Sequence, residues 1–173
     1  MYNSHQIPKD TIYAIFSNLT ELLDFQCRFL VSLEGSVSLG FNEHRVGALF
    51  ISNAEGFDLY IRICGNFAHA MQTANIHQEL LSKISKVDPI RQLQSLLILP
   101  IQRICRYPLL LRELVKLSSP DNYGYCEELT ESLDIIKLAT DKVNEAQRMG
   151  ENAIIKKSLL TKIVDWKVNL ILY

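Results

Sequence analysis

The apolar positions of this chain recur at steps of three and four residues, which is the period of an α-helix. One stripe runs over residues 7–34 and a second over residues 45–75, so both segments are predicted to be amphipathic helices. Asn18 followed three residues later by Glu21 resembles a capping box, which predicts that the first stripe breaks near this point into two helices. Gly35 is expected to end the second of them.

The rest of the chain is predicted to be helical as well. The second stripe is expected to loosen at residues 53–56, and a shorter helix follows at about residues 76–86. A long apolar helical segment occupies about residues 91–116, and residues 118–124 form the clearest loop. The last helix spans about residues 125–166, or roughly 60 Å at 1.5 Å per residue, so it should project or bend. No strand pattern repeats along the sequence, and the predicted fold class is all-α.

Two prolines interrupt the apolar segment at residues 91–116. Each removes an amide donor and crowds the carbonyl four residues back, so Pro100 should disturb the backbone at Leu96 and Pro108 the backbone at Ile104. We therefore expect a bent or irregular helix that its neighbours hold in place. Three polar side chains lie largely off its apolar face: Gln102, Arg103 and Arg106.

Composition limits the classes of partner and compartment. The chain has 173 residues, enough for one domain with a real core. Its formal net charge of -1 argues against nucleic acid or an anionic membrane surface as a partner recognised by bulk charge. The four cysteines are widely separated, which favours reduced thiols in a cytosolic protein. No signal segment and no apolar run near the roughly 20 residues of a membrane span occurs, so a soluble intracellular protein is expected.

The sequence offers no constellation for bond-making chemistry. Phosphate-cradling patterns such as GxxxxGK[ST] and GxGxxG are absent, as is the zinc pattern HExxH, so no cofactor or metal is expected. The acidic residues Glu127, Glu128 and Glu131 lie in the first turns of a predicted helix, where carboxylates favour the helix dipole. The polar residues Gln102, Arg103 and Arg106 leave two interpretations open: a solvated helix face or a rigid recognition surface.

Residues 99–114 read LPIQRICRYPLLLREL, which closely resembles the third conserved region of the Dbl-homology domain. This domain is the exchange-factor domain for Rho-family small GTPases. Other segments resemble the family at matching distances. Residues 46–50, 57, 60 and 66–67 resemble its second conserved region, and residues 15–34 resemble the segment that follows its first region. Residues 143–145 and 164–167 resemble its last helix and the end of that helix. Within the family, residues 10–13, 24–30 and 164–167 are similar to exchange factors of fungal cell polarity, which favours a GTPase of the cell-division-control type.

The resemblance implies an elongated helical bundle that grips the switch regions of a GTPase. Such a factor binds the nucleotide-free GTPase better than the GDP-bound form, so it is expected to act without covalent chemistry and not as a bond-making enzyme. By position, Arg106 and Asn144 match residues that contact switch 2, with Gln102 beside them. Ile98 matches the position that helps choose among Rho GTPases. Three residues are expected to give structural support: Arg103, Pro100 and Pro108.

One part of the family pattern is missing. The first conserved region, whose glutamate engages switch 1, is not found, so residues 1–167 are expected to form a Dbl-homology domain with a truncated first helix. Residues 168–173 are expected to begin a missing pleckstrin-homology domain. Only through that domain is the cytoplasmic protein expected to contact a membrane and to be recruited to the cell cortex. The alternative is a non-catalytic helical interaction module that binds a GTPase or forms a homodimer through the groove left by the truncated helix.

Overall fold

The computed structural model describes residues 7–40, 43–84 and 88–171, and side chains as far as residue 163. Within these ranges the chain is helical and has no strand, which confirms the all-α prediction. The elements are α1 (Lys9–Phe16), α2 (Leu19–Val37), α3 (Val46–Ser52), the 3₁₀ turn η2 (Ala54–Asp58), α4 (Leu59–Gly65), α5 (Phe67–Ile76), α6 (Gln78–Ser82), α7 (Pro89–Leu117) and α8 (Cys126–Ile171).

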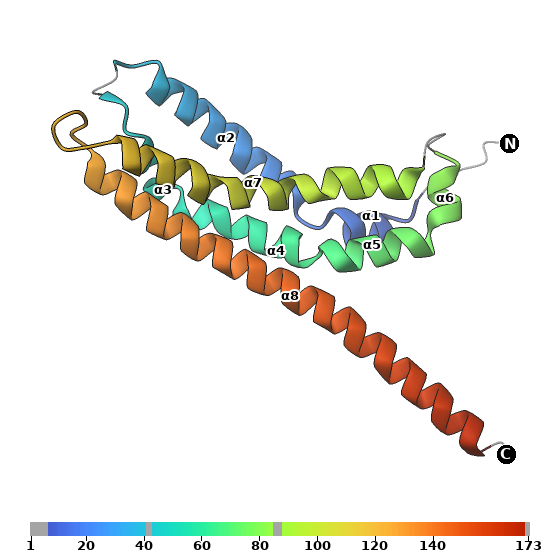
Figure 1. Ribbon diagram of the computed structural model, residues 1–173. Helices are drawn as coiled ribbons and strands as arrows, with labels where there is room; N and C mark the ends of the chain where they lie inside the picture. The colour runs from blue at the N-terminus through green and yellow to red at the C-terminus, as the bar shows by residue number, and fades with distance from the viewer. Residues whose placement is uncertain (1–6, 41–42, 85–87, 172–173) are drawn as a thin grey trace, which may run out of the picture.

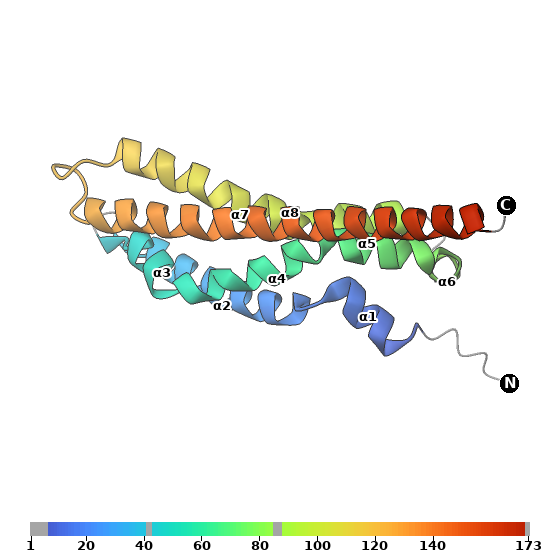
Figure 2. The same ribbon diagram turned by 90° about the horizontal axis from the view of Figure 1, so that it is seen from below.

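The molecule is an elongated bundle built along its last helix. Helix α8 has 46 residues, so it is about 69 Å long at 1.5 Å per residue. Its first half packs beside α3, α4 and α7, and its second half extends beyond them (Figures 1 and 2). The expected projection is confirmed, although the helix continues past residue 166 as far as Ile171.

A large hydrophobic core joins α2, α3, α4, α7 and α8. Its centre is aromatic, because the rings of Phe25, Phe29, Phe50 and Phe57 contact one another at centroid distances of 5.0 to 6.0 Å. Phe57 has no exposed surface, and it lies at this centre. A separate small cluster holds α1, α5 and α7 together: Ile15, Ala70, Ala74 and Leu97.

The break between α1 and α2 lies where the sequence predicts it, but its cause differs. Ser17 adopts a positive φ of 48° and separates the two helices. The predicted capping box is wrong, because the Asn18 side chain makes no capping hydrogen bond. Its Nδ2 instead donates to the backbone oxygen of Leu59 at 2.9 Å, so a buried amide joins the start of α2 to α4. Helix α2 also passes Gly35 and ends at Val37.

Residues 45–75 form four short pieces instead of one long helix. The predicted loosening at residues 53–56 is confirmed by the 3₁₀ turn η2. A second break at Asn66 was not predicted. The Asn66 side chain donates to the backbone oxygen of Ala14 at 2.9 Å, so this break also serves a contact with a distant segment. The helix expected at residues 76–86 is short, α6, and residues 85–87 lie outside the described ranges.

Helix α7 begins at a clear sequence signal and passes through both prolines. Asp88 caps it, since one carboxylate oxygen accepts hydrogen bonds from the amides of Ile90 and Arg91 at 3.1 and 3.2 Å. The helix remains continuous at Pro100 and Pro108. It changes direction near its middle in both views (Figures 1 and 2), in agreement with the expected bend.

Candidate functional site

The outward face of α7 carries the polar residues that the motif singles out. Ile101 and Ile104 are buried in the core, whereas Gln102 and Arg106 are exposed. Gln102 and Arg106 are four positions apart in the sequence, so they lie on the same face of the helix, about one turn apart. Among the described residues, neither forms a hydrogen bond or ion pair. Their polar groups are therefore available to a partner.

The side chain of the neighbouring Arg103 reaches α2. Its Nη1 donates to the Oε1 atom of Gln26 at 3.0 Å, and the hydroxyl of Tyr107 donates to the same oxygen at 3.0 Å. Gln26 is only 9% exposed. Nothing in the motif indicated Gln26, although a glutamine inside the apolar stripe of Leu22, Phe25 and Phe29 is the signal that could have found it.

Asn144 lies on the flank of α8 that points away from α3 and η2. Lys142 ion-pairs with Asp58 at 3.1 Å, and Glu128 pairs with Arg45, so these positions mark the flank toward α3 and η2. Asn144 is two residues beyond Lys142, which places it on roughly the opposite side of the helix. Its side chain is exposed, beside the fully buried Val143.

Helices α7 and α8 contact each other and run antiparallel (Figure 1). Arg106 is one turn beyond Gln102, about 6 Å further along α7. Ile98 is half-buried against the core.

Close backbone contact fixes α8 near Asn144. A Cβ atom at Gly150 would lie 2.3 Å from the backbone oxygen of Gly65, and one at Gly65 would lie 3.2 Å from the Cβ of Ala146. Nearer the other end of the bundle, a Cβ at Gly47 would lie 2.5 Å from the backbone of α8. The absence of side chains at these positions lets α8 approach the end of α4 and the start of α3 directly.

Burial dominates the pKa values of the titratable side chains in the core. Burial raises the pKa of the Cys64 thiol to about 12, and burial is also the main cause that raises the pKa of Tyr60 and of Tyr107. These groups stay neutral and inert at neutral pH. In the described part of the chain, no three His, Cys, Asp or Glu side chains are placed to hold a metal ion. None of its helices is long and apolar enough to cross a membrane.

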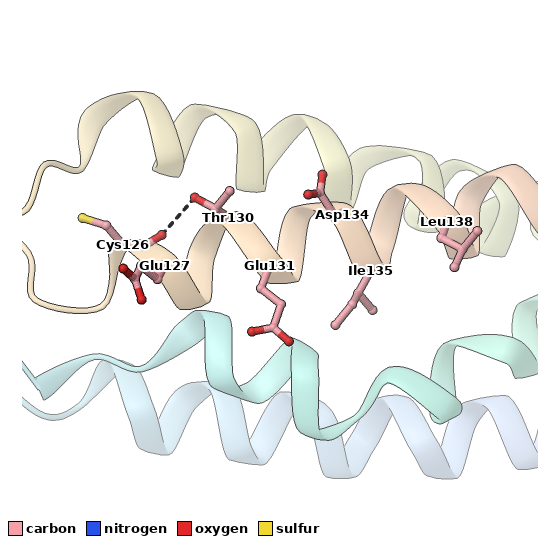
Figure 3. A pocket seen from close by; sticks show the side chains of 7 residues that line it. All are labelled: Cys126, Glu127, Thr130, Glu131, Asp134, Ile135 and Leu138. Atoms are coloured by element: carbon pink, nitrogen blue, oxygen red, sulfur yellow. Dashed lines mark hydrogen bonds between the residues drawn. The ribbon is translucent and has the colours of Figure 1, made fainter.

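A shallow depression lies on the first half of α8 (Figure 3). Figure 3 shows its side chains spread along the helix without a common focus, and Thr130 donates to the backbone oxygen of Cys126 at 3.0 Å. Glu127, Glu131 and Asp134 give it an acidic rim. The arrangement offers no enclosed site for a small molecule.

Comparisons with known proteins agree with this description. The model of the RhoGEF domain family matches residues 1–144. The Rho guanine nucleotide exchange factor scd1 of Schizosaccharomyces pombe is 46% identical over 159 residues, which are 91% of this chain and 18% of that protein. Cell division control protein 24 of Saccharomyces cerevisiae is 37% identical over 171 residues, 96% of this chain and 20% of that protein.

A solved structure shows the same architecture. The apo structure of the activated truncation of Vav1 aligns with a TM-score of 0.71 at 25% identity, over 94% of this chain and 41% of that chain. This confirms the elongated bundle as the fold. The chain spans about a fifth of the length of the two curated relatives it matches.

Proposed function

The chain belongs to the RhoGEF domain family, and from that membership we propose that it promotes GDP release from a Rho-family small GTPase of the cell-division-control type. The observation that carries the proposal is the surface of α7 and α8, where Gln102, Arg106 and Asn144 are exposed, unpaired and supported by a rigid core. The names of the two fungal relatives support the choice of GTPase class.

Exchange on this surface needs only differential binding. A factor that binds the nucleotide-free GTPase more tightly than the GDP-bound form shifts the equilibrium toward the empty state and accelerates GDP release. The guanidinium of Arg106 and the amide of Asn144 can each donate hydrogen bonds to the carbonyl and carboxylate oxygens of switch 2. Gln102 lies one turn from Arg106 on the same face of α7. Half-buried Ile98 presents an apolar surface that distinguishes one GTPase side chain from another.

The four thiols support a reducing compartment. Cys27, Cys64, Cys105 and Cys126 are all free in the structure. Unpaired cysteines are typical of cytosolic proteins, so we place the exchange reaction in the cytoplasm, at the cortex where a polarity GTPase would be activated.

The proposal is tested by release of a fluorescent GDP analogue from a purified Rho-family GTPase on addition of the 173-residue chain. Faster release than in buffer is expected, and Arg106→Ala should reduce the acceleration because it removes a charged donor from the contact. Arg91→Ala is the matched control, an exposed arginine four turns away on the same helix. Equal loss in both variants would contradict the assigned role of Arg106.

A second candidate function is supported by exposed apolar side chains beside the Gln26–Arg103 contact. They form one stripe on α2 and one on α7, each 41 to 60% exposed: Leu23, Leu30 and Val37; Leu99, Leu110 and Leu114. Such a surface is typical of a protein contact, so the chain could act as a non-catalytic module that forms a homodimer there. Light scattering after size-exclusion chromatography decides: a dimer that Leu30→Glu converts to a monomer supports this function, and a wild-type monomer excludes it.

A further inference from the structure

A partly buried polar contact joins α2 to the middle of α7. Gln26 of α2 is 9% exposed, and its Oε1 accepts two hydrogen bonds of 3.0 Å, from Arg103 and from Tyr107. The two donors are four residues apart, so one oxygen holds two consecutive turns of the same helix. The Nε2 of Gln26 has no hydrogen-bond partner. The acceptor oxygen therefore makes all the hydrogen bonds of this side chain.

Tyr107 is also fixed by its ring. The ring packs edge-on against Phe50 and Phe57 at centroid distances of 5.5 and 5.7 Å, and against Phe29 at 6.3 Å. Edge-to-face contacts of this kind favour one orientation of each ring. With its ring held by the aromatic core and its hydroxyl held by Gln26, Tyr107 has little freedom to rotate.

The same part of α7 is weakened along its own axis. Pro100 and Pro108 have no amide hydrogen, so the carbonyls of Leu96 and Ile104 lose their helical donors. The segment between the prolines is thus less restrained by backbone hydrogen bonds at both ends. Its orientation must depend on lateral contacts, and the bond from Arg103 to Gln26 lies near its centre.

We propose that Gln26 is a positioning residue for the partner-binding surface of α7. Arg103 and Tyr107 are the direct chain neighbours of Gln102 and Arg106, so fixing the first pair sets the rotation at which the second pair faces outward. The proposal rests on the proposed exchange function, because it assigns Gln26 a role through those two contact residues and no contact of its own.

Two substitutions at this position separate its acceptor from its shape. Gln26→Met keeps the approximate length and volume but removes the acceptor, and it should weaken binding to the nucleotide-free GTPase about tenfold, a typical coupling between connected residues. Gln26→Glu keeps an acceptor for both donors and adds the opposite charge to Arg103, while the unpaired Nε2 is no loss. Binding by Gln26→Glu should remain close to wild type.

The control is Ile15→Val, which removes one methyl group from the separate small core cluster. It lowers stability without touching α2 or the aromatic core, so its binding should be unchanged. Amide hydrogen exchange adds a readout that needs no GTPase. Residues 101–107 should exchange faster in Gln26→Met than in wild type, and at the wild-type rate in Ile15→Val and in Gln26→Glu.

A double-mutant cycle shows whether Gln26 acts through the contact residues. If it does, Gln26→Met has a smaller effect on binding when Arg106 is already alanine. Full additivity, or wild-type binding by Gln26→Met, would overturn the positioning role and leave the exchange function standing. If the wild-type chain binds no nucleotide-free Rho GTPase, both the nucleotide-exchange function and the positioning role in binding are contradicted. The amide hydrogen-exchange rates then still show whether Gln26 orders residues 101–107.

Discussion

The contact between α4 and α8 predicts opposite effects for the same substitution at two helical glycines. Gly150→Ala places a Cβ atom 2.3 Å from the backbone oxygen of Gly65, where neither side can move as a flexible side chain would. To reach ordinary contact, α8 must shift from α4 by about 1 Å. Gly35→Ala on α2 meets no atom within 4 Å. The substitution is therefore the same at both positions, and only the room for the added methyl group differs.

The expected free energies follow from two effects. Alanine favours a helix over glycine by up to about 1 kcal/mol, so Gly35→Ala should raise the free energy of unfolding by about 0.5 to 1 kcal/mol. At Gly150 the same gain is opposed by overpacking, which costs about 1 to 3 kcal/mol in a close-packed contact. Gly150→Ala should therefore lower the free energy of unfolding, and the two variants should differ by about 2 kcal/mol.

Urea denaturation followed by far-UV circular dichroism measures both values. A difference of about 2 kcal/mol corresponds to midpoints of thermal unfolding about 4 to 8 °C apart in a domain of this size. Stabilisation by Gly150→Ala equal to that by Gly35→Ala would refute the close approach of α8 to α4. Because Asn144 lies less than two turns from Gly150, weaker GTPase binding by the alanine variant should accompany its lower stability.

Two further predictions concern single side chains. Asn144→Ala should weaken binding to the nucleotide-free GTPase by about 1 to 4 kcal/mol if this amide is a central contact, whereas Asn152→Ala, an exposed asparagine two turns further along α8, should bind as wild type in titration calorimetry. The raised pKa of buried Cys64 predicts that stability is lost as pH rises above the ordinary thiol pKa, since the unfolded chain then releases a proton that the folded chain keeps. Between pH 8 and 10 the free energy of unfolding should fall by about 1 kcal/mol more in wild type than in Cys64→Ala, measured by urea denaturation.

The apolar period and local signals were sufficient to predict much of the fold. They placed the break near Asn18, the start of α7 to within two residues, the loop before α8 and the length of α8 to within a turn or so. These features depend on residues close together in sequence, where periodicity, caps and prolines act.

The missed features all depend on partners far along the chain. Asn18 was interpreted as a local cap, but its amide bonds Leu59, and Asn66 breaks a helix to bond Ala14. Gly150 allows contact with Gly65, which no local pattern indicates. A helical period shows which face is buried and does not show which residue of another helix will meet it.

The candidate site likewise contains residues that the sequence predicted and one that it missed. The periodicity of α7 placed Gln102 and Arg106 off its apolar face, and the structure confirms that both are exposed. The link to Asn144 came from family resemblance alone, and the structure adds that α7 and α8 are antiparallel neighbours. Gln26 was not a candidate at all, because its importance lies in a contact with Arg103, 77 residues away.

The central claim is that this surface binds the empty form of a Rho-family GTPase in preference to the loaded form. Surface plasmon resonance with the immobilised chain measures this directly, using one cell-division-control-type GTPase either stripped of nucleotide or loaded with GDP and magnesium. The account predicts a stable complex with the stripped GTPase that dissociates when GDP and magnesium are added. Equal affinity for both forms, or no complex with the stripped form, would contradict it.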